Sequence, residues 1–131
     1  MKRKRLMDLI PLGEGFTTEF KRAGTSNLGR EICAFANATG GVILIGVTDK
    51  GEIVGVADHN RLKSEVQAIA RSAEPPISVD VEIVEQVLCV DIPAQNGKPY
   101  SFGGKFFLHA QQGICRTYIK AFYLSKFLPQ M

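Results

Sequence analysis

The apolar run GGVILIGV, residues 40–47, constrains the fold more than any other stretch of the chain. It is short and is bounded by glycines, which is typical of a strand buried on both faces rather than of a helix. The sequence TDKG follows it and predicts a turn, and EIVGV, residues 52–56, is expected to return as its hairpin partner. A chain with such a strand forms a sheet with a packed interior.

Further strands are predicted on either side of this run. FTTEFKR alternates apolar and polar side chains, which predicts a half-buried strand that turns Glu19 and Lys21 outward together. ISVDVEIV and VLCVDIPA predict a hairpin that turns at Glu85-Gln86, with Asp80, Glu82 and Glu85 facing outward. A last short strand is expected around Lys105–His109, followed by a turn at Gly113.

Helical spacing of apolar residues predicts two helices between these strands. The first begins at Ser26 or Asn27 and ends between Asn37 and Gly41, and the second begins at Asp58 or Asn60 and ends at the sequence EPP. YIKAFYLSKFL is expected to close the chain as a third helix. The order of elements predicts an α+β fold, a single compact domain over residues 14–131 with a mixed β-sheet and about three helices. Residues 1–13 are expected to form a basic N-terminal arm and an irregular lead-in.

Composition bears on the cellular location of the protein and on the state of its cysteines. No apolar run approaches the ~18 residues that cross a membrane, so a cytoplasmic protein is expected. Cys33, Cys89 and Cys115 are odd in number and lie in apolar patterns, which favours buried thiols over disulfides. The sequence has no C-x-x-C motif and only two histidines, which argues against a structural zinc site.

Charge is distributed unevenly along the chain. Residues 1–30 carry a net charge of +4, residues 31–91 carry −6 and residues 92–131 carry +5. If the two ends of the chain meet on one face, that face is positive and suits phosphates. The alternative is that these blocks of sequence do not correspond to faces of the fold.

The segment GTSNLGRE, residues 24–31, has the glycine spacing of a phosphate-binding loop between a strand and a helix. Arg30 and Glu31 stand where that loop needs lysine and a hydroxyl, and a carboxylate there repels a triphosphate. ATP is therefore not expected as a cofactor. A weaker anion site at the helix N-terminus, with Lys21, Arg22 and Arg30 beside it, stays open, as does a plain connection.

Three carboxylates form a second candidate site. A bend at Gly15 lets Glu14 and Glu19 converge, and Asp49 stands near the end of the neighbouring buried strand. Three hard oxygen ligands suit Mg²⁺ or Mn²⁺, and Lys21 on the same strand face as Glu19 could stabilise developing charge. The alternative is that these are exposed acids on an edge strand and in a turn.

The stretches TEFKRAG and NLGREICAFANATGGVILIGVTDKGEIVGV together resemble the signature of the Schlafen AlbA-type domain. The resemblance is close over residues 14–56 and looser through the second helix and through GKPY, Gly97 to Tyr100. It implies a nucleic-acid-binding domain of the kind found in microbial transcriptional regulators, without need of a cofactor. In the Schlafen branch it implies a metal-dependent endoribonuclease with three carboxylates, for which Glu14 and Glu19 match and either Asp49 or Asp58 is the third.

One departure from the family concerns the C-terminal part. FFLHAQQGICRTYIKAF keeps Gly113 and Arg116 but not the serines that many relatives carry there. Phosphate contacts made by those hydroxyls are therefore not expected in this chain.

Three functional hypotheses follow from the sequence. The first is a module that binds nucleic acid, with DNA favoured over RNA, through the basic residues Lys2, Arg3, Lys4, Arg5, Lys21, Arg22, Arg30, Lys105 and Arg116. The second is a metal-dependent nuclease that uses Glu14, Glu19 and Asp49 with Lys21. The third is an assembly domain whose apolar strands pair across a homodimer.

Overall fold

A computed structural model describes residues 3–15, 17–95, 99–110 and 114–118. Its three helices and seven strands confirm the predicted α+β fold with a mixed sheet. The helices are α1 (Arg3–Leu12), α2 (Leu28–Asn37) and α3 (His59–Arg71), and the strands are β1 (Thr18–Lys21), β2 (Gly41–Ile45), β3 (Asp80–Val84), β4 (Val87–Ile92), β5 (Ser101–Phe102), β6 (Lys105–Ala110) and β7 (Ile114–Tyr118).

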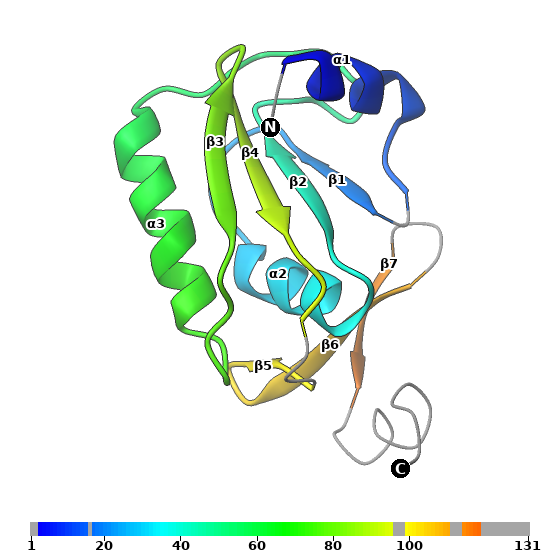
Figure 1. Ribbon diagram of the computed structural model, residues 1–131, viewed down its shortest axis with the longest axis vertical. Coiled ribbons are helices and arrows are strands. Elements are labelled where there is room, and N and C mark those ends of the chain that lie inside the picture. Colours follow the sequence, from blue (N-terminus) through cyan, green and yellow to red (C-terminus); the bar gives the residue numbers. More distant parts are fainter. Residues whose placement is uncertain (1–2, 16, 96–98, 111–113, 119–131) are drawn as a thin grey trace.

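The main sheet has the order β1-β2-β4-β3 (Figure 1). β1 runs parallel to β2, and the other neighbouring pairs are antiparallel. Four of the five residues of β2 are buried, as its apolar run predicts. β2 and β4 lie inside the sheet and β1 and β3 form its edges, so apolar strands that pair across a dimer would have to use those edges.

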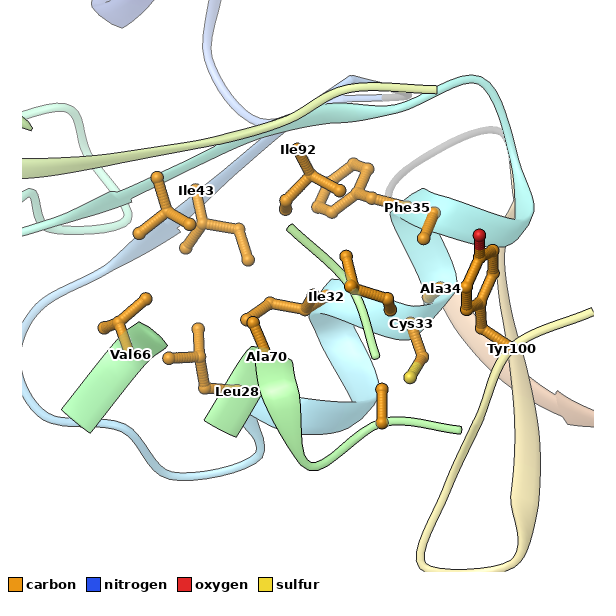
Figure 2. Close-up of a cluster of buried hydrophobic side chains, with 14 of the residues drawn as sticks. Leu28, Ile32, Cys33, Ala34, Phe35, Ile43, Val66, Ala70, Ile92 and Tyr100 are labelled. Carbon is orange, nitrogen blue, oxygen red and sulfur yellow. The ribbon is translucent and has the colours of Figure 1, made fainter. Parts of the chain in front are cut away.

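Helices cover both faces of this sheet. On one face, Leu6 of α1 packs with Phe20, Val42, Leu44 and Cys89. On the other face, α2 and α3 pack on Ile43, Leu88, Val90 and Ile92, as Figure 2 shows for the side chains around Ile32 and Phe35. The alternation of β2 side chains between the two clusters explains why its whole sequence is apolar.

A second, antiparallel sheet of order β5-β6-β7 packs against α2 from its other side. α2 is therefore enclosed between two sheets, and every residue of α2 except Arg30 is buried. Asn37, 3% exposed, joins the layers. Its side-chain nitrogen donates to the carbonyl oxygens of Tyr100 (2.9 Å) and Phe107 (2.8 Å), and its Oδ1 accepts from the Tyr100 N–H (2.6 Å).

The glycine pair between α2 and β2 is required by close packing. Gly40 has φ +86, and a Cβ there would lie 2.5 Å from the Ile92 carbonyl oxygen. A Cβ at Gly41 would lie 2.3 Å from the ring of Phe35. Glycine alone lets α2 end and β2 begin within this space.

The irregular N-terminal arm predicted for residues 1–13 is wrong for most of its length, because residues 3–12 form α1. Leu6 is fully buried, and Leu9 and Ile10 pack beside it at helical spacing. Burial of this apolar stripe on the open face of the sheet stabilises a helix that its basic, proline-containing sequence did not suggest.

The hairpin predicted for EIVGV is also wrong. Only an isolated bridge joins Val47 to Ile53, and the N–H groups of Val54 (2.8 Å) and Gly55 (3.0 Å) both donate to the Gly46 carbonyl oxygen. Two donors on one carbonyl oxygen are typical of a loop, whereas a hairpin would have continued the alternating hydrogen bonds between two strands. The hairpin at Glu85-Gln86 is confirmed, with both turn residues at positive φ.

Other predictions are settled for part of the chain. Asn27 and Asp58 are the N-cap residues of α2 and α3, although neither side chain makes a capping hydrogen bond. Cys33 and Cys89 are buried thiols, as expected. No helix in the described ranges is long and apolar enough to cross a membrane. The predicted turn at Gly113 and the last helix lie outside the described residues.

Candidate nucleic-acid interface

The three predicted carboxylates, Glu14, Glu19 and Asp49, lie near one another beside the parallel pair of strands. Glu19 lies on β1, and Asp49 follows the end of β2, so both are near the edge that β1 forms. The Gly15 N–H donates to the Thr18 carbonyl oxygen (3.0 Å), which turns the chain before β1. The Glu14 carboxylate accepts a hydrogen bond from the Phe20 backbone and meets Asp49, as the proposed bend at Gly15 requires.

Burial and the proximity of other acids raise the pKa values of Glu14 and Glu19. The pKa of Glu19 is raised to about 7, chiefly by burial and then by the charges of Glu14, Glu31 and Asp49, while Lys21 acts in the opposite direction. The pKa of Glu14 is also raised: partial burial of its carboxyl is the largest cause, followed by the charge of Asp49 and a hydrogen bond with it. The site is a concentration of negative charge that protons or a cation would relieve.

The structure distinguishes the two candidates for the third carboxylate. Asp49 raises the pKa of both glutamates. Asp58 is the N-cap of α3 and lines a surface groove with Arg61, and it is not among the groups that raise the pKa of either glutamate. Within the described part of the chain, however, no three acidic, histidine or cysteine side chains stand in a group that could hold a metal ion as placed.

Lys21 is engaged inside the protein. Its side chain is 14% exposed, and its Nζ lies 2.7 Å from Glu31 Oε1 and 2.6 Å from the Ser26 carbonyl oxygen. The sequence predicted Lys21 to point outward as a phosphate contact or an aid to catalysis. Both roles stay predictions, and in either role Lys21 would have to contact a phosphate in place of, or in addition to, Glu31.

Glu31 is a member of the site that sequence reasoning missed. From the sequence, Glu31 was considered only as a carboxylate that would repel a triphosphate, but this residue is buried and only 9% exposed. The signal was present: positions 28, 31, 32 and 35 share one face of a helix, so Glu31 falls on the apolar stripe of α2. A charged side chain on such a stripe requires a partner, and Lys21 is that partner.

The basic residues divide into two sets. Arg3 and Arg5 of α1 form ion pairs with Glu85 (2.8 Å) and Asp91 (3.2 Å) of the central segment. At α1 the basic N-terminal block therefore contacts the acidic block, which favours the alternative that blocks of sequence do not correspond to faces of the fold. Lys4 is exposed on the same helix, and Lys2 and the side chain of Arg116 lie outside the described residues.

Arg30 and Lys105 form the second set. They are far apart in the sequence, yet they line one groove of about 390 Å³ between the start of α2 and the β5–β6 hairpin. Gly29, Ile69, Phe102 and Phe107 also line this groove, which we call the α2–hairpin groove. Arg22 lines another groove, of about 370 Å³, with Lys50 and Asp49. Basic residues that were proposed from the sequence as phosphate contacts therefore line two surface grooves.

Comparisons with known proteins agree with this architecture. Residues 14–117 match the family described as "Schlafen, AlbA_2". The chain belongs to the Schlafen AlbA_2 family. A search of curated protein sequences gave no significant match.

A solved structure also resembles the Schlafen AlbA_2 domain of this chain. The DIP2311 protein from Corynebacterium diphtheriae superposes with a TM-score of 0.61 at 21% sequence identity, over 83% of this chain and 23% of that protein. At this identity the likeness concerns the fold. The chain thus spans about a quarter of the length of that protein.

The family match includes Glu14, Glu19 and Asp49 and all residues that line the α2–hairpin groove. α1 precedes the matched residues. The matched family is a domain type associated with nucleic acids. The aromatic side of the groove does not follow from the sequence, which predicts only a short strand around Lys105–His109 in this region. The paired glycines after Phe102 were the available signal for a tight hairpin.

Proposed function

We propose that this chain binds DNA through its phosphate backbone, in the cytoplasm, as the nucleic-acid-binding part of a protein of the transcriptional-regulator type. The regulator role and the choice of DNA over RNA follow the family resemblance. The observation that carries the binding function is the α2–hairpin groove, which brings the exposed side chains of Arg30 and Lys105 together.

The charge of this groove suits a phosphate chain. No acidic residue of the described ranges lines it. The N-terminus of α2, at Leu28, opens onto it and adds positive potential from the helix dipole. We place the contact surface at Arg30 and Lys105 because they line the same groove, and Arg22, which lines the second groove with Lys50, is a further basic residue of the proposed surface. Arg3 and Arg5 lie on α1 and line neither of these two grooves.

The test is binding of a fluorescent mixed-sequence 20-base-pair duplex, measured by anisotropy at several salt concentrations. Contacts from three basic side chains predict roughly a 40-fold loss of affinity between 50 and 200 mM salt. The double variant Arg30→Gln/Lys105→Gln should weaken binding at low salt and reduce the slope of log K against log salt by about two.

A matched control is Lys63→Gln, which removes an exposed charge from α3 outside the groove. It should leave the affinity nearly unchanged. Absence of binding at 50 mM salt, or binding that does not respond to salt, would contradict the proposal.

A metal-dependent endoribonuclease is the second candidate, and the raised pKa values of Glu14 and Glu19 favour it. Burial is the largest cause of both shifts, and the charges of neighbouring acids add to it, so a divalent cation bound there would lower the cost of ionising these carboxyls. Mg²⁺ or Mn²⁺ would supply charge neutralisation and an activated water. As the side chains are placed, the described residues do not form a complete metal site.

Two measurements decide on this candidate. Mn²⁺ should raise the melting temperature of the natural protein at pH 8, where Glu19 is ionised, and should not raise that of Glu19→Ala. The natural protein should also cleave structured RNA with Mn²⁺ present while the variant does not. Equal cleavage by both proteins, or no cleavage by either, removes the nuclease reading.

A further inference from the structure

The ring of Phe102 packs closely on α2. A Cβ built on Gly29 would lie 2.3 Å from Phe102 Cζ and 2.5 Å from both Cε atoms. Three ring atoms at nearly equal distance place this point over the face of the ring, since an approach at the ring edge would bring Cζ much closer than the other two. One face of Phe102 therefore rests on the backbone of Gly29, and only glycine permits that contact.

Strand register places the charged residue beside this ring. Phe102 pairs with Lys105 across the two-residue turn Gly103-Gly104, and Ser101 pairs with Phe106. Residues opposite each other in an antiparallel pair point to the same side, and so do residues two apart on one strand. Phe102, Lys105 and Phe107 thus share the face of the hairpin that meets α2, and Phe106 points the other way.

The α2–hairpin groove combines these features at the scale of one nucleotide. Its volume of about 390 Å³ lies at the lower end of the range for small-molecule pockets, roughly 300–1,000 Å³. Phe102 is half-buried, Phe107 is 6% exposed, and Arg30 and Lys105 are exposed at the rim. An aromatic floor with cations around it is the arrangement that binds single-stranded nucleic acid by stacking and phosphate contact.

We propose that this groove holds one unpaired nucleotide of a DNA strand, with its base stacked at Phe102 and its phosphates beside Arg30 and Lys105. This inference rests on the proposed function and adds the substrate class. In a blunt duplex each base is paired and stacked within the helix, so it cannot offer its face to a side chain without leaving the stack. Single-stranded DNA, or a duplex with a single-stranded end, is therefore the preferred ligand.

The first experiment uses the absence of tryptophan from the natural sequence. Phe102→Trp introduces a single tryptophan at the proposed stacking position, and Phe106→Trp introduces one on the opposite side of the hairpin. Addition of oligo(dT) of 12 nucleotides should quench the fluorescence of the first variant and leave that of the second nearly unchanged. Equal quenching of the two variants, or quenching of neither, overturns the proposal.

The second experiment measures affinity with Phe102→Leu, which keeps an apolar side chain and removes the aromatic face. Stacking of one base contributes about 1–3 kcal/mol, so the variant should bind oligo(dT) at least about fivefold more weakly. Its affinity for a blunt 12-base-pair duplex should change less than twofold. Phe106→Leu is the matched control and should alter neither affinity, and thermal melting verifies that both variants are folded.

The outcomes separate this inference from the proposed function. Blunt duplex bound as tightly as oligo(dT), with Phe102→Leu unchanged, contradicts the stacking groove and leaves backbone binding in place. Binding of neither ligand contradicts both. Oligo(U) bound more tightly than oligo(dT) overturns the assignment to DNA.

Discussion

The raised pKa of Glu19 reflects the burial and the negative charge of the site in which it lies. Its side chain lies on the edge strand, partly withdrawn from water and surrounded by three other acids. A carboxyl group in this position holds its proton up to a higher pH than an exposed one does. The sequence predicted its neighbours Glu14 and Asp49, but the degree of burial depends on packing that spacing alone does not specify.

A pH-dependent stability follows from Glu19. Its pKa is about 7 in the folded protein and near 4.5 when unfolded, so the folded state binds the proton more tightly. Stability from this residue is complete below pH 4.5 and is lost as the pH rises through 7. Glu19→Gln should therefore be more stable than the natural protein at pH 8, by about 1–3 kcal/mol, and nearly equal to it at pH 4.5.

Urea unfolding at both pH values measures this difference. An equal effect of Glu19→Gln at both pH values would contradict the raised pKa.

The Lys21–Glu31 ion pair predicts a second effect at the residue scale. Lys21→Met leaves the Glu31 carboxylate enclosed without its cation, and it removes the charge that lowers the pKa of Glu19. We expect a loss of about 1–3 kcal/mol at pH 8 and an upward shift of the Glu19 pKa, the latter measured by NMR titration.

A double-mutant cycle completes this test. Glu31→Gln added to Lys21→Met should recover part of the lost stability, because a neutral amide is less costly to enclose than an unpaired carboxylate. Strictly additive losses would show that the two side chains do not interact.

At the scale of elements, local patterns predicted most of the helices and strands. β2, β4, α2 and α3 followed from apolar periodicity and turn residues. α1 did not, because its stripe is short and becomes apparent only when the open face of the sheet is known. The role of the β5–β6 hairpin was also hidden, since it depends on a contact between Gly29 and Phe102 across two distant segments.

α1 provides the test of its own packing. Leu6 is fully buried against the sheet, so Leu6→Ala should lower the free energy of unfolding by about 2–4 kcal/mol. Leu12→Ala, at the exposed end of the same helix, should have little effect because that side chain is 79% exposed. Chemical unfolding of the two variants checks this, and similar losses would contradict the observed docking of α1.

Asn37 tests the link between α2 and the second sheet. Asn37→Leu removes its three hydrogen bonds and leaves the buried backbone groups of Tyr100 and Phe107 without that partner. We expect a loss of about 2–4 kcal/mol and faster amide hydrogen exchange in β5 and β6. Thr39→Ala, at a nearby exposed position, is the control. Unchanged exchange in the hairpin of Asn37→Leu would show that Asn37 does not hold the layers together.

At the scale of the whole molecule, the sheets and helices bring two kinds of site to the surface. One is a group of acids beside β1, and the other is a basic and aromatic groove between α2 and the hairpin. The sequence predicted the family and several of the charged residues of both sites. It did not predict the ion pairs that Arg3, Arg5 and Lys21 form with acids, or the groove that Arg30 and Lys105 share, because both depend on tertiary neighbours.

The most direct test of the account is an NMR map of the DNA-contact surface. Backbone amide shifts of the ¹⁵N-labelled chain would be recorded as single-stranded DNA of 12 nucleotides is added at low salt. We predict that the largest shift changes fall at Gly29, Arg30, Phe102 and Lys105, and that these shift changes disappear in Arg30→Gln/Lys105→Gln. Changes centred on α1 and the Glu85-Gln86 turn, with the α2–hairpin groove unaffected, would contradict it.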